Sequence, residues 1–221
     1  CNPAPIFDRH FTVASLKHTT QDIVSSVGSL LQIARDASPD YALFYNGPAC
    51  GASAPDHLHF QMIPADALVF LDSLQTKPAK CSGLTVREIE AARLDRSIVI
   101  LESPDEDRLS RNFASFMSVA QTILAIGDEA PVNVFCSYRK DCWRLTIFLR
   151  RKHRPDAYYA AGDDRIFVSP GAIDMAGVIV IPRRIDFERL DGDALRSIYR
   201  EVSLEQETMN KIVETWSRSN G

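Results

Sequence analysis

The alternation of hydrophobic and polar positions predicts a first set of short strands and one helix in the N-terminal part of the chain. Residues 5–15 have the pattern of an extended segment, and residues 41–45 form a short apolar strand. Between them, apolar residues from Ile23 to Ala34 recur at helical spacing after a capping sequence at 19–22, which predicts a helix. A second strand ends the set at His57–Gln61.

A second set of elements follows the same order. It contains a strand at 97–101, a helix that begins after Ser103-Pro104-Asp105, and two strands at 132–138 and 143–150. The order strand, helix, strand, turn, strand therefore occurs twice, about 90 residues apart, although the residues of the two copies barely match. This order predicts two similar halves.

The segments outside these two sets have weaker patterns. The remaining expected elements are a short helix at 66–74, a polar connection at 75–83, two short strands at 165–168 and 177–181, and a C-terminal helix from Asp193 to about Trp216 with a break near Ser203. An apolar stripe on one face of the last helix is the reason for that prediction.

The strongest chemical signal lies in the second strand of the first set. Alternation places His57, His59 and Gln61 on one face of this strand and apolar residues on the other. The preceding loop, Gly51-Ala52-Ser53, has little side-chain bulk, so its backbone N–H groups and the Ser53 hydroxyl can approach an anion closely. An exposed polar face of an edge strand is the simpler interpretation, and the loop argues against it.

The strand histidines have three chemical uses, because an imidazole beside an anion-binding loop can be a general base, a metal ligand or a nucleophile. The sequence has no Gly-x-Ser-x-Gly elbow, and no carboxylate or cysteine stands at a convincing spacing from His10, His57 and His59 to complete a metal site. A neutral imidazole attacks phosphorus near pH 7, and the phosphorylated ring is a good leaving group in turn. The nucleophile interpretation therefore fits best.

The motif Asn46…Gly51-Ala52-Ser53…His57-x-His59-x-Gln61 resembles the active-site signature of the histidine-triad (HIT-like) superfamily. It is most similar to the branch that contains galactose-1-phosphate uridylyltransferase, the diadenosine tetraphosphate phosphorylases (ATP adenylyltransferases) and the GDP-hexose phosphorylases. The resemblance implies a duplicated α+β HIT-like fold, with helices packed on an antiparallel sheet. It implies a catalytic half at 1–83 and a second half at 84–221, packed as one unit. Only the first half carries His-x-His-x-Gln, and Arg144–Phe148 stands at the corresponding place in the second.

The resemblance also implies roles for residues of the motif. His59 would be the nucleophile that becomes nucleotidylated, and His57 would orient it or hold the loop. Ser53 and the Gly51 backbone would bind the neighbouring phosphate, and Asn46 would hold the loop or His59.

The third position of the motif separates two reaction types. HIT hydrolases have a histidine where this chain has Gln61, which would donate a hydrogen bond to a non-bridging phosphate oxygen. A carboxamide cannot act as general base for water, so the covalent intermediate is expected to survive until an anionic acceptor arrives. A transferase is therefore favoured over a hydrolase. The uridylyltransferases have proline where this chain has Leu58, which favours the phosphorylases.

Metal ligation is the second implication of the resemblance. Zinc-bearing uridylyltransferases use the first histidine of the motif, an upstream histidine and two upstream cysteines, and His57 and His10 could match the two histidines. The sequence from Cys1 onward holds no such cysteine pair and shows nothing of a segment before it. We therefore expect no required cofactor, with a structural zinc or a bound Mg²⁺ as the alternatives.

A basic run at the end of the second copy is the candidate site for the distal phosphates. If the strand continued, Arg150, Lys152 and Arg154 would point to one side, which predicts that these three bind the substrate. Arg151 and His153 are the less favoured candidates. The alternative is a charged surface exposed to solvent.

Composition restricts the class of protein. Hydrophobic residues make up 45% and charged residues 24% of the 221 residues, as in soluble globular proteins, and the net charge of -4 argues against a general nucleic-acid binder. The apolar stretches are too short to span a bilayer, and the sequence contains no secretory signal. Five cysteines without a Cys-x-x-Cys pair suit reduced thiols, which predicts a cytoplasmic protein.

Together these observations predict a nucleotidyltransferase of this branch. It would move a nucleoside monophosphate from a dinucleoside polyphosphate or a nucleoside diphosphate sugar to phosphate or a sugar phosphate, in a ping-pong mechanism through nucleotidyl-His59. Two halves in one chain can pair with each other, which predicts a monomer, with a homodimer as the alternative. The rival functions are a HIT-type nucleotide hydrolase and a nucleotide-binding regulator without turnover.

Overall fold

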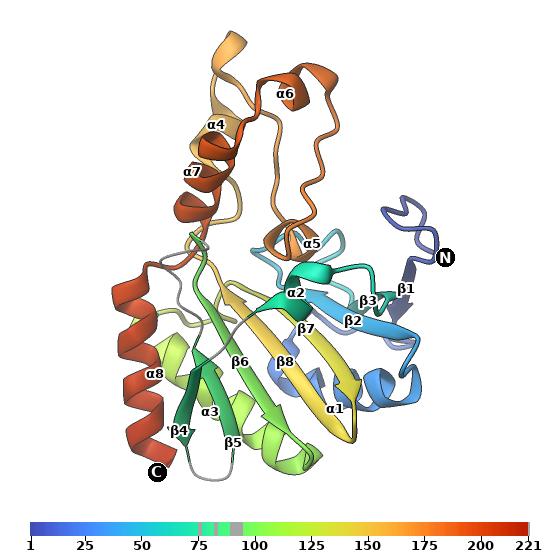
Figure 1. Ribbon diagram of the computed structural model, residues 1–221, viewed down its shortest axis with the longest axis vertical. Coiled ribbons are helices and arrows are strands. Elements are labelled where there is room, and N and C mark those ends of the chain that lie inside the picture. The colour runs from blue at the N-terminus through green and yellow to red at the C-terminus, as the bar shows by residue number, and fades with distance from the viewer. Residues whose placement is uncertain (75–76, 82–83, 89–94, 221) are drawn as a thin grey trace.

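The protein is built on one eight-stranded antiparallel sheet with helices on both faces (Figure 1). This computed structural model describes residues 1–74, 77–81, 84–88 and 95–220. The strands are β1 (Phe11–Ala14), β2 (Tyr41–Asn46), β3 (His59–Pro64), β4 (Lys77–Cys81), β5 (Leu84–Glu88), β6 (Ile98–Ser103), β7 (Val132–Arg139) and β8 (Cys142–Leu149). They lie in the order β1-β3-β2-β7-β8-β6-β5-β4. The α+β class expected from the sequence is confirmed.

The helices form two layers and an arm. They are α1 (Ile23–Asp36), α2 (Val69–Ser73), α3 (Glu106–Leu124), α4 (Asp156–Tyr159), α5 (Ala172–Met175), α6 (Arg184–Arg189), α7 (Gly192–Val202) and α8 (Gln206–Asn220), with a 3₁₀ turn η2 (Gly162–Asp164). On one face α3 packs between α1 and α8, whereas α5 packs against β2 and β7 on the other face. Residues 155–202, called the arm below, carry α4, α6 and α7 beyond the end of the sheet (Figure 1).

Alternation along the strands divides the core in two. Tyr45 and Phe60 belong to the core beneath α1, α3 and α8. Phe44 and Ile63 belong to a second core on the opposite face, where α5 and α7 pack. Because side chains alternate along a strand, Asn46 and Gln61 share the face of the second core.

The two long helices begin at aspartate caps. Asp22 accepts hydrogen bonds from the backbone N–H groups of Val24 and Ser25, and Asp105 accepts one from Arg108. These bonds satisfy donors that the first turn of a helix leaves free. Both helix starts predicted from the sequence are therefore confirmed.

The order strand, helix, strand, strand occurs twice along the chain, and the two sets of strands are neighbours in the sheet. The chain runs β1-α1-β2-β3 and later β6-α3-β7-β8, as expected from the sequence. Across the sheet, the strands β1-β3-β2 are followed by β7-β8-β6, so corresponding strands lie at equal distances from the β2–β7 junction. At this junction Asn46 pairs with Asn133. The strand order is consistent with two similar halves, whose duplication stays a prediction.

The predicted boundary between the halves is not visible as a break in the sheet. Residues 82–83, where this boundary falls, lie outside the described residues, as do 75–76. The expected polar connection contains β4, which pairs with β5 on the edge of the second half. The prediction of an irregular connection at 75–83 is therefore wrong for residues 77–81.

Two strands predicted in the arm are absent, because neither 165–168 nor 177–181 is a strand. Side-chain carboxylates take the place of a neighbouring strand. The backbone N–H of Phe167 donates to Asp186 and that of Val180 to Asp174, at 3.0 and 2.8 Å. The predicted break in the C-terminal helix is confirmed, since α7 ends at Val202 and α8 begins at Gln206.

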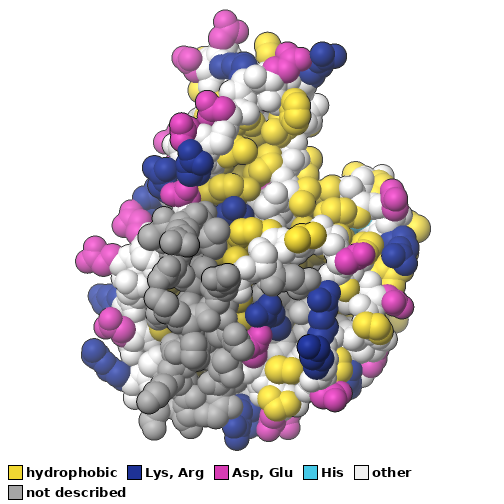
Figure 2. All heavy atoms as spheres, viewed as in Figure 1, with side chains coloured by type: hydrophobic (Ala, Val, Ile, Leu, Met, Phe, Trp, Pro, Cys, Tyr) yellow, Lys and Arg dark blue, Asp and Glu magenta, His cyan; other side chains and the backbone are white. Residues whose placement is uncertain are grey.

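The surface carries charges of both signs. Figure 2 shows basic and acidic side chains interspersed over the viewed face. Within the described ranges, no helix combines the length and apolar character needed to cross a membrane.

Candidate active site

A cavity of about 340 Å³ lies on the sheet face opposite α1 and α3, between the two halves. Its lining is contributed by Ile6, Phe44, Asn46, Gly51, Ala52, Ser53 and Gln61 from the first half and by His153, Arg154, Ser169, Gly171, Ala172, Ile173, Asp174 and Val180 from the second. The structure therefore brings Asn46, Gly51, Ser53 and Gln61 of the predicted motif together with Arg154 of the basic run. His57, His59, Arg150 and Lys152 are not part of this lining.

His59 begins β3 and is only 6% exposed. It lies one pleat from Gln61, which places both side chains on the same face of the strand. Its Nδ1 is 2.8 Å from the carbonyl oxygen of His57. A carbonyl can only accept, so Nδ1 carries the proton and Nε2 carries the lone pair. Nε2 has no hydrogen-bond partner in the part of the chain that the structure describes. This is the tautomer that a nucleophilic histidine needs.

Gln21 holds His59 and Asn46 together, a role that was not predicted from the sequence. Its side-chain Nε2 donates to the backbone oxygens of Asn46 and His59 at 3.2 and 3.3 Å, and its Oε1 accepts from the His59 N–H at 2.8 Å. The Gln21 amide thus replaces the backbone hydrogen bonds between β2 and β3 at the point where the two strands separate. A glutamine just before a helix cap has the pattern of an ordinary loop residue, which is why sequence reasoning missed it.

Asn46 ties the first half to α5. Its Oδ1 accepts hydrogen bonds from the Ala172 N–H and from Asn133 Nδ2, both at 2.8 Å. The same Asn133 group donates to the carbonyl oxygen of Cys50, in the loop before the histidines. Asn46 therefore positions both the loop and the wall of the cavity that faces it.

The loop and the arm meet at two glycines. A Cβ atom on Gly51 would lie 3.2 Å from the Gly171 Cα, and Gly51 has a φ of +98°. Both the space and the backbone conformation require glycine at position 51. The loop that includes Ser53 is thereby brought against the second half.

The basic run has a different structure from the one expected. β8 ends at Leu149, and residue 150 makes only an isolated bridge to Ser203, so no strand carries alternate side chains through Arg154. The prediction that Arg150, Lys152 and Arg154 share one strand face is wrong. The strand ends because the Arg151 backbone N–H donates to Val202 of the arm instead of to a neighbouring strand.

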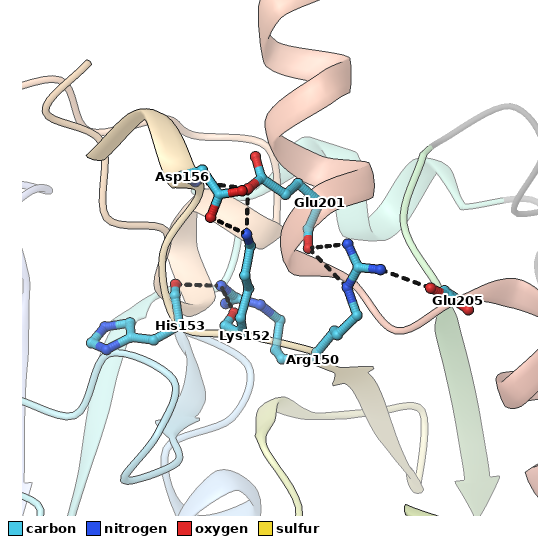
Figure 3. A network of polar contacts seen from close by, with 7 residues as sticks. Arg150, Lys152, His153, Asp156, Glu201 and Glu205 are labelled. Carbon is cyan, nitrogen blue, oxygen red and sulfur yellow. Dashed lines mark hydrogen bonds and ion pairs between the residues drawn. The ribbon is translucent and has the colours of Figure 1, made fainter. Parts of the chain in front are cut away.

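Arg150 is an interior residue, 1% exposed. Its guanidinium donates to the side chain of Asn133 and to the carbonyl oxygens of Lys152, His153, Pro170 and Val202, at 2.8 to 3.2 Å. Figure 3 shows it below the ion pairs of Lys152 with Asp156 and Glu201. These contacts join β8 to the arm and leave little of Arg150 for a ligand, so its role in phosphate binding stays a prediction that the geometry does not favour.

Arg154 is the cation of the cavity lining. Its Nε donates to Ser169 Oγ at 2.8 Å, and its guanidinium lies 4.4 Å from the centre of the Tyr158 ring. These two contacts fix the side chain, and its terminal nitrogens have no hydrogen-bond partner among the described residues. Beside it, burial, and then the charges of Arg154 and Arg150, lower the pKa of His153. His153 is therefore a neutral polar group in the cavity near pH 7.

Asp174 contributes a carboxylate to the lining, and both of its oxygens accept hydrogen bonds from backbone N–H groups. One oxygen accepts from the Gly171 N–H at 2.9 Å and the other from the Val180 N–H at 2.8 Å. Burial raises the pKa of Asp174 to about 6. The two bonds hold the backbone on either side of α5 in place.

The family described as GDPGP1-like, C-terminal domain, matches residues 101–218, more than half of the chain. The chain belongs to the GDPGP1-like family. A second family, a domain of unknown function called DUF4922, matches residues 1–64 of this GDPGP1-like protein. No curated protein matches the chain.

The solved structure of a yeast enzyme shows the same fold. Yeast Ap4A phosphorylase Apa2, in its complexes with AMP and with Ap4A, is 17% identical to this GDPGP1-like chain, with a TM-score of 0.62 over 90% of this chain and 70% of the yeast chain. A DUF4931 family protein from Bacillus cereus is 15% identical, with a TM-score of 0.47 over 79% of this chain and 90% of that one. With the family match, the yeast fold confirms the resemblance to this HIT-like branch.

The zinc site of the uridylyltransferases does not fit the residues that this GDPGP1-like chain provides. His10 lies against Gln61 at 2.7 Å, whereas His57 Nδ1 is 3.3 Å from His18 Nδ1 and its Nε2 donates to the Ser15 oxygen. The histidine beside His57 is therefore His18 and not His10. Within the described ranges, no group of three or more His, Cys, Asp or Glu side chains could hold a metal. No step below uses a metal.

Substitution of Gly51 tests the junction between the loop and the arm. Gly51→Ala is expected to lower the free energy of unfolding by about 1–3 kcal/mol, because alanine is strained at positive φ and its Cβ meets Gly171. Gly28→Ala is the matched control, since Gly28 lies in α1 with open space around it, and a gain of about 0.5–1 kcal/mol is expected. Urea unfolding measures both. Equal effects of the two substitutions would contradict this account of the loop.

Proposed function

We propose that this protein is a nucleotidyltransferase of the phosphorylase type. It transfers a nucleoside monophosphate from a dinucleoside polyphosphate or a nucleoside diphosphate sugar to phosphate or a sugar phosphate, by way of nucleotidyl-His59. The observation that carries the proposal is the bond from His59 Nδ1 to the His57 oxygen, which leaves a lone pair on Nε2 of a side chain that shares its strand face with Gln61, a residue of the cavity lining. The fold of an Ap4A phosphorylase and the GDPGP1-like family match support this choice.

The first displacement forms the covalent intermediate. The lone pair on His59 Nε2 attacks the α-phosphorus, an N–P bond forms, and the bond from phosphorus to the bridging oxygen breaks. The leaving nucleoside polyphosphate or sugar phosphate takes the electron pair of that bond. The positive charge that develops on the ring is stabilised because Nδ1–H already donates to the His57 oxygen at 2.8 Å.

The second displacement reverses these changes with a new acceptor. An oxygen of phosphate or of a sugar phosphate attacks the same phosphorus, the N–P bond breaks, and the lone pair returns to Nε2. No proton has to leave an anionic acceptor oxygen, so the reaction needs no general base. Water would need one, and the carboxamide of Gln61 cannot supply it. This is why transfer is proposed rather than hydrolysis.

The cavity provides donors for the phosphates of both substrates. We assign the phosphate at the reacting centre to Gln61 and Ser53, because both line the cavity on the side of the first half. Arg154 of the second half is assigned to the distal phosphate, where its fixed guanidinium can donate two hydrogen bonds. Lys152 is left out of the assignment, since Asp156 and Glu201 pair with it.

Intact-mass measurement tests the proposed function. The protein is mixed without phosphate with diadenosine tetraphosphate and, separately, with a GDP-hexose, and one donor is expected to add a single nucleoside monophosphate. Added phosphate should then discharge the adduct and release a nucleoside diphosphate. Rapid release of nucleoside monophosphate without any phosphate would instead show a hydrolase. Tight nucleotide binding without an adduct or turnover would show a regulator.

A further inference from the structure

The N-terminal loop, residues 2–10, holds the side chain of Gln61. Gln61 Oε1 is 2.7 Å from His10 Nε2 and 3.1 Å from Asn2 Nδ2. His10 is only 3% exposed, and its ring lies between those of Phe7 and Phe44, with centroids 6.3 and 5.9 Å away. A buried histidine bonded to a residue of the active site is more than a packing residue.

The backbone of the loop decides which atom of His10 carries the proton. The Ile6 N–H donates to His10 Nδ1 at 3.2 Å, so Nδ1 must hold a lone pair. Nε2 of the neutral ring therefore carries the proton and can only donate. Burial lowers the pKa of His10, which keeps the ring neutral near pH 7. The group that faces Nε2 must be an acceptor, and in Gln61 that is Oε1.

Asn2 leads to the same orientation by an independent route. Its Oδ1 accepts from the Ala4 N–H at 2.9 Å, and its backbone N–H donates to the His10 oxygen at 2.8 Å. With Oδ1 committed to Ala4, the Asn2 NH₂ group faces Gln61. Two donors, each oriented by a different backbone N–H, therefore fix the oxygen of the Gln61 amide on the loop side.

We propose that His10 is a positioning residue. It fixes the orientation of the Gln61 amide, so that the NH₂ group of Gln61 donates a hydrogen bond to the transferred phosphoryl group. With Oε1 held by the loop, the Gln61 NH₂ group is left for the cavity that this residue lines. A phosphoryl oxygen accepts from NH₂ but repels a carbonyl oxygen, so a flipped amide would weaken binding at the reacting centre. The proposal rests on the proposed function. It gives the N-terminal loop the role of orienting Gln61, which lies 51 residues after His10 and binds the phosphate.

A double-mutant cycle separates positioning from general support of the fold. His10→Phe keeps a ring between Phe7 and Phe44 and removes the donor, and it is expected to slow nucleotidylation of His59 about tenfold. His10→Gln keeps a donor near Nε2 and is expected to restore most of the rate. In a Gln61→Ala background, His10→Phe is expected to change the rate less than about twofold. The same tenfold loss in both backgrounds would overturn the proposal.

Two further readouts do not depend on turnover. Nitrogen-15 NMR of the resting protein at pH 7 is expected to show His10 protonated at Nε2 and bare at Nδ1, and the opposite tautomer would overturn the proposal. If the wild type forms no adduct, the proposed function fails. The same double-mutant cycle is then measured by calorimetry, as the affinity for inorganic pyrophosphate. His10→Phe is expected to weaken this affinity about tenfold when Gln61 is present and to leave it unchanged in the Gln61→Ala background. Unchanged affinity in His10→Phe, or an absence of pyrophosphate binding, would overturn the positioning role.

Discussion

The His59→Gly variant is expected to form no nucleotidyl adduct and to lose about four orders of magnitude or more in turnover. The reason is that Nε2 of His59 is the proposed attacking atom, and His153 and His10 cannot replace it from where they lie. His10 Nε2 carries a proton that it donates to Gln61. Steady-state rates with the preferred donor and phosphate measure the loss, and circular dichroism verifies that the variant is folded.

Free imidazole provides the matched control for this variant. Glycine at position 59 leaves a space of the size of an imidazole ring. Added imidazole is expected to recover part of the turnover in His59→Gly and to leave a His153→Asn variant unchanged. Retention of wild-type turnover by His59→Gly would contradict the assignment of the nucleophile.

The Arg150→Ala variant is expected to lose about 3–5 kcal/mol in the free energy of unfolding. Alanine would leave the carbonyl oxygens of Pro170 and Val202, among other acceptors, buried without a donor. The neighbouring Arg151 is the control, because its side chain is 45% exposed and its pair with Glu205 is on the surface. Arg151→Ala is expected to change stability by about 1 kcal/mol or less. Urea unfolding at 25 °C measures both.

Arg150→Lys distinguishes an interior role from a phosphate-binding role if the alanine variant does not fold. Lysine keeps the charge but cannot form the five hydrogen bonds that Arg150 makes. We therefore expect a loss of stability without a specific rise in KM for the donor. A large rise in KM at unchanged stability would show that Arg150 binds phosphate after all, as the sequence first suggested.

Local rules predicted most of the fold. Helix starts at Asp22 and Asp105 follow from capping, which involves atoms only a few residues apart. The alternation that placed His59 and Gln61 on one face is likewise a property of a single strand. The repeated element order was visible because each helix and strand has its own hydrophobic period. In the structure the strands of both copies lie in one sheet.

What the sequence could not show depends on contacts between distant residues. Arg150 was expected to bind the distal phosphates from a strand face, yet it lies buried among acceptors from Asn133 to Val202. Gln21 bonds to Asn46 and His59, and His10 to Gln61, across 25 to 51 residues of sequence. Neither set of contacts can be recognised in a single sequence, because a buried amide or imidazole cannot be distinguished from an ordinary polar residue until the positions of its partners are known.

Localisation of the adduct tests the central claim most directly. The protein is loaded with its preferred donor in the absence of phosphate, denatured in base to protect the acid-labile N–P bond, digested, and sequenced by tandem mass spectrometry. We predict one nucleoside monophosphate on His59, lost when phosphate is added before denaturation. A nucleotide on His57, His10 or His153, or product formation in a single turnover with no adduct at any time, would contradict the mechanism.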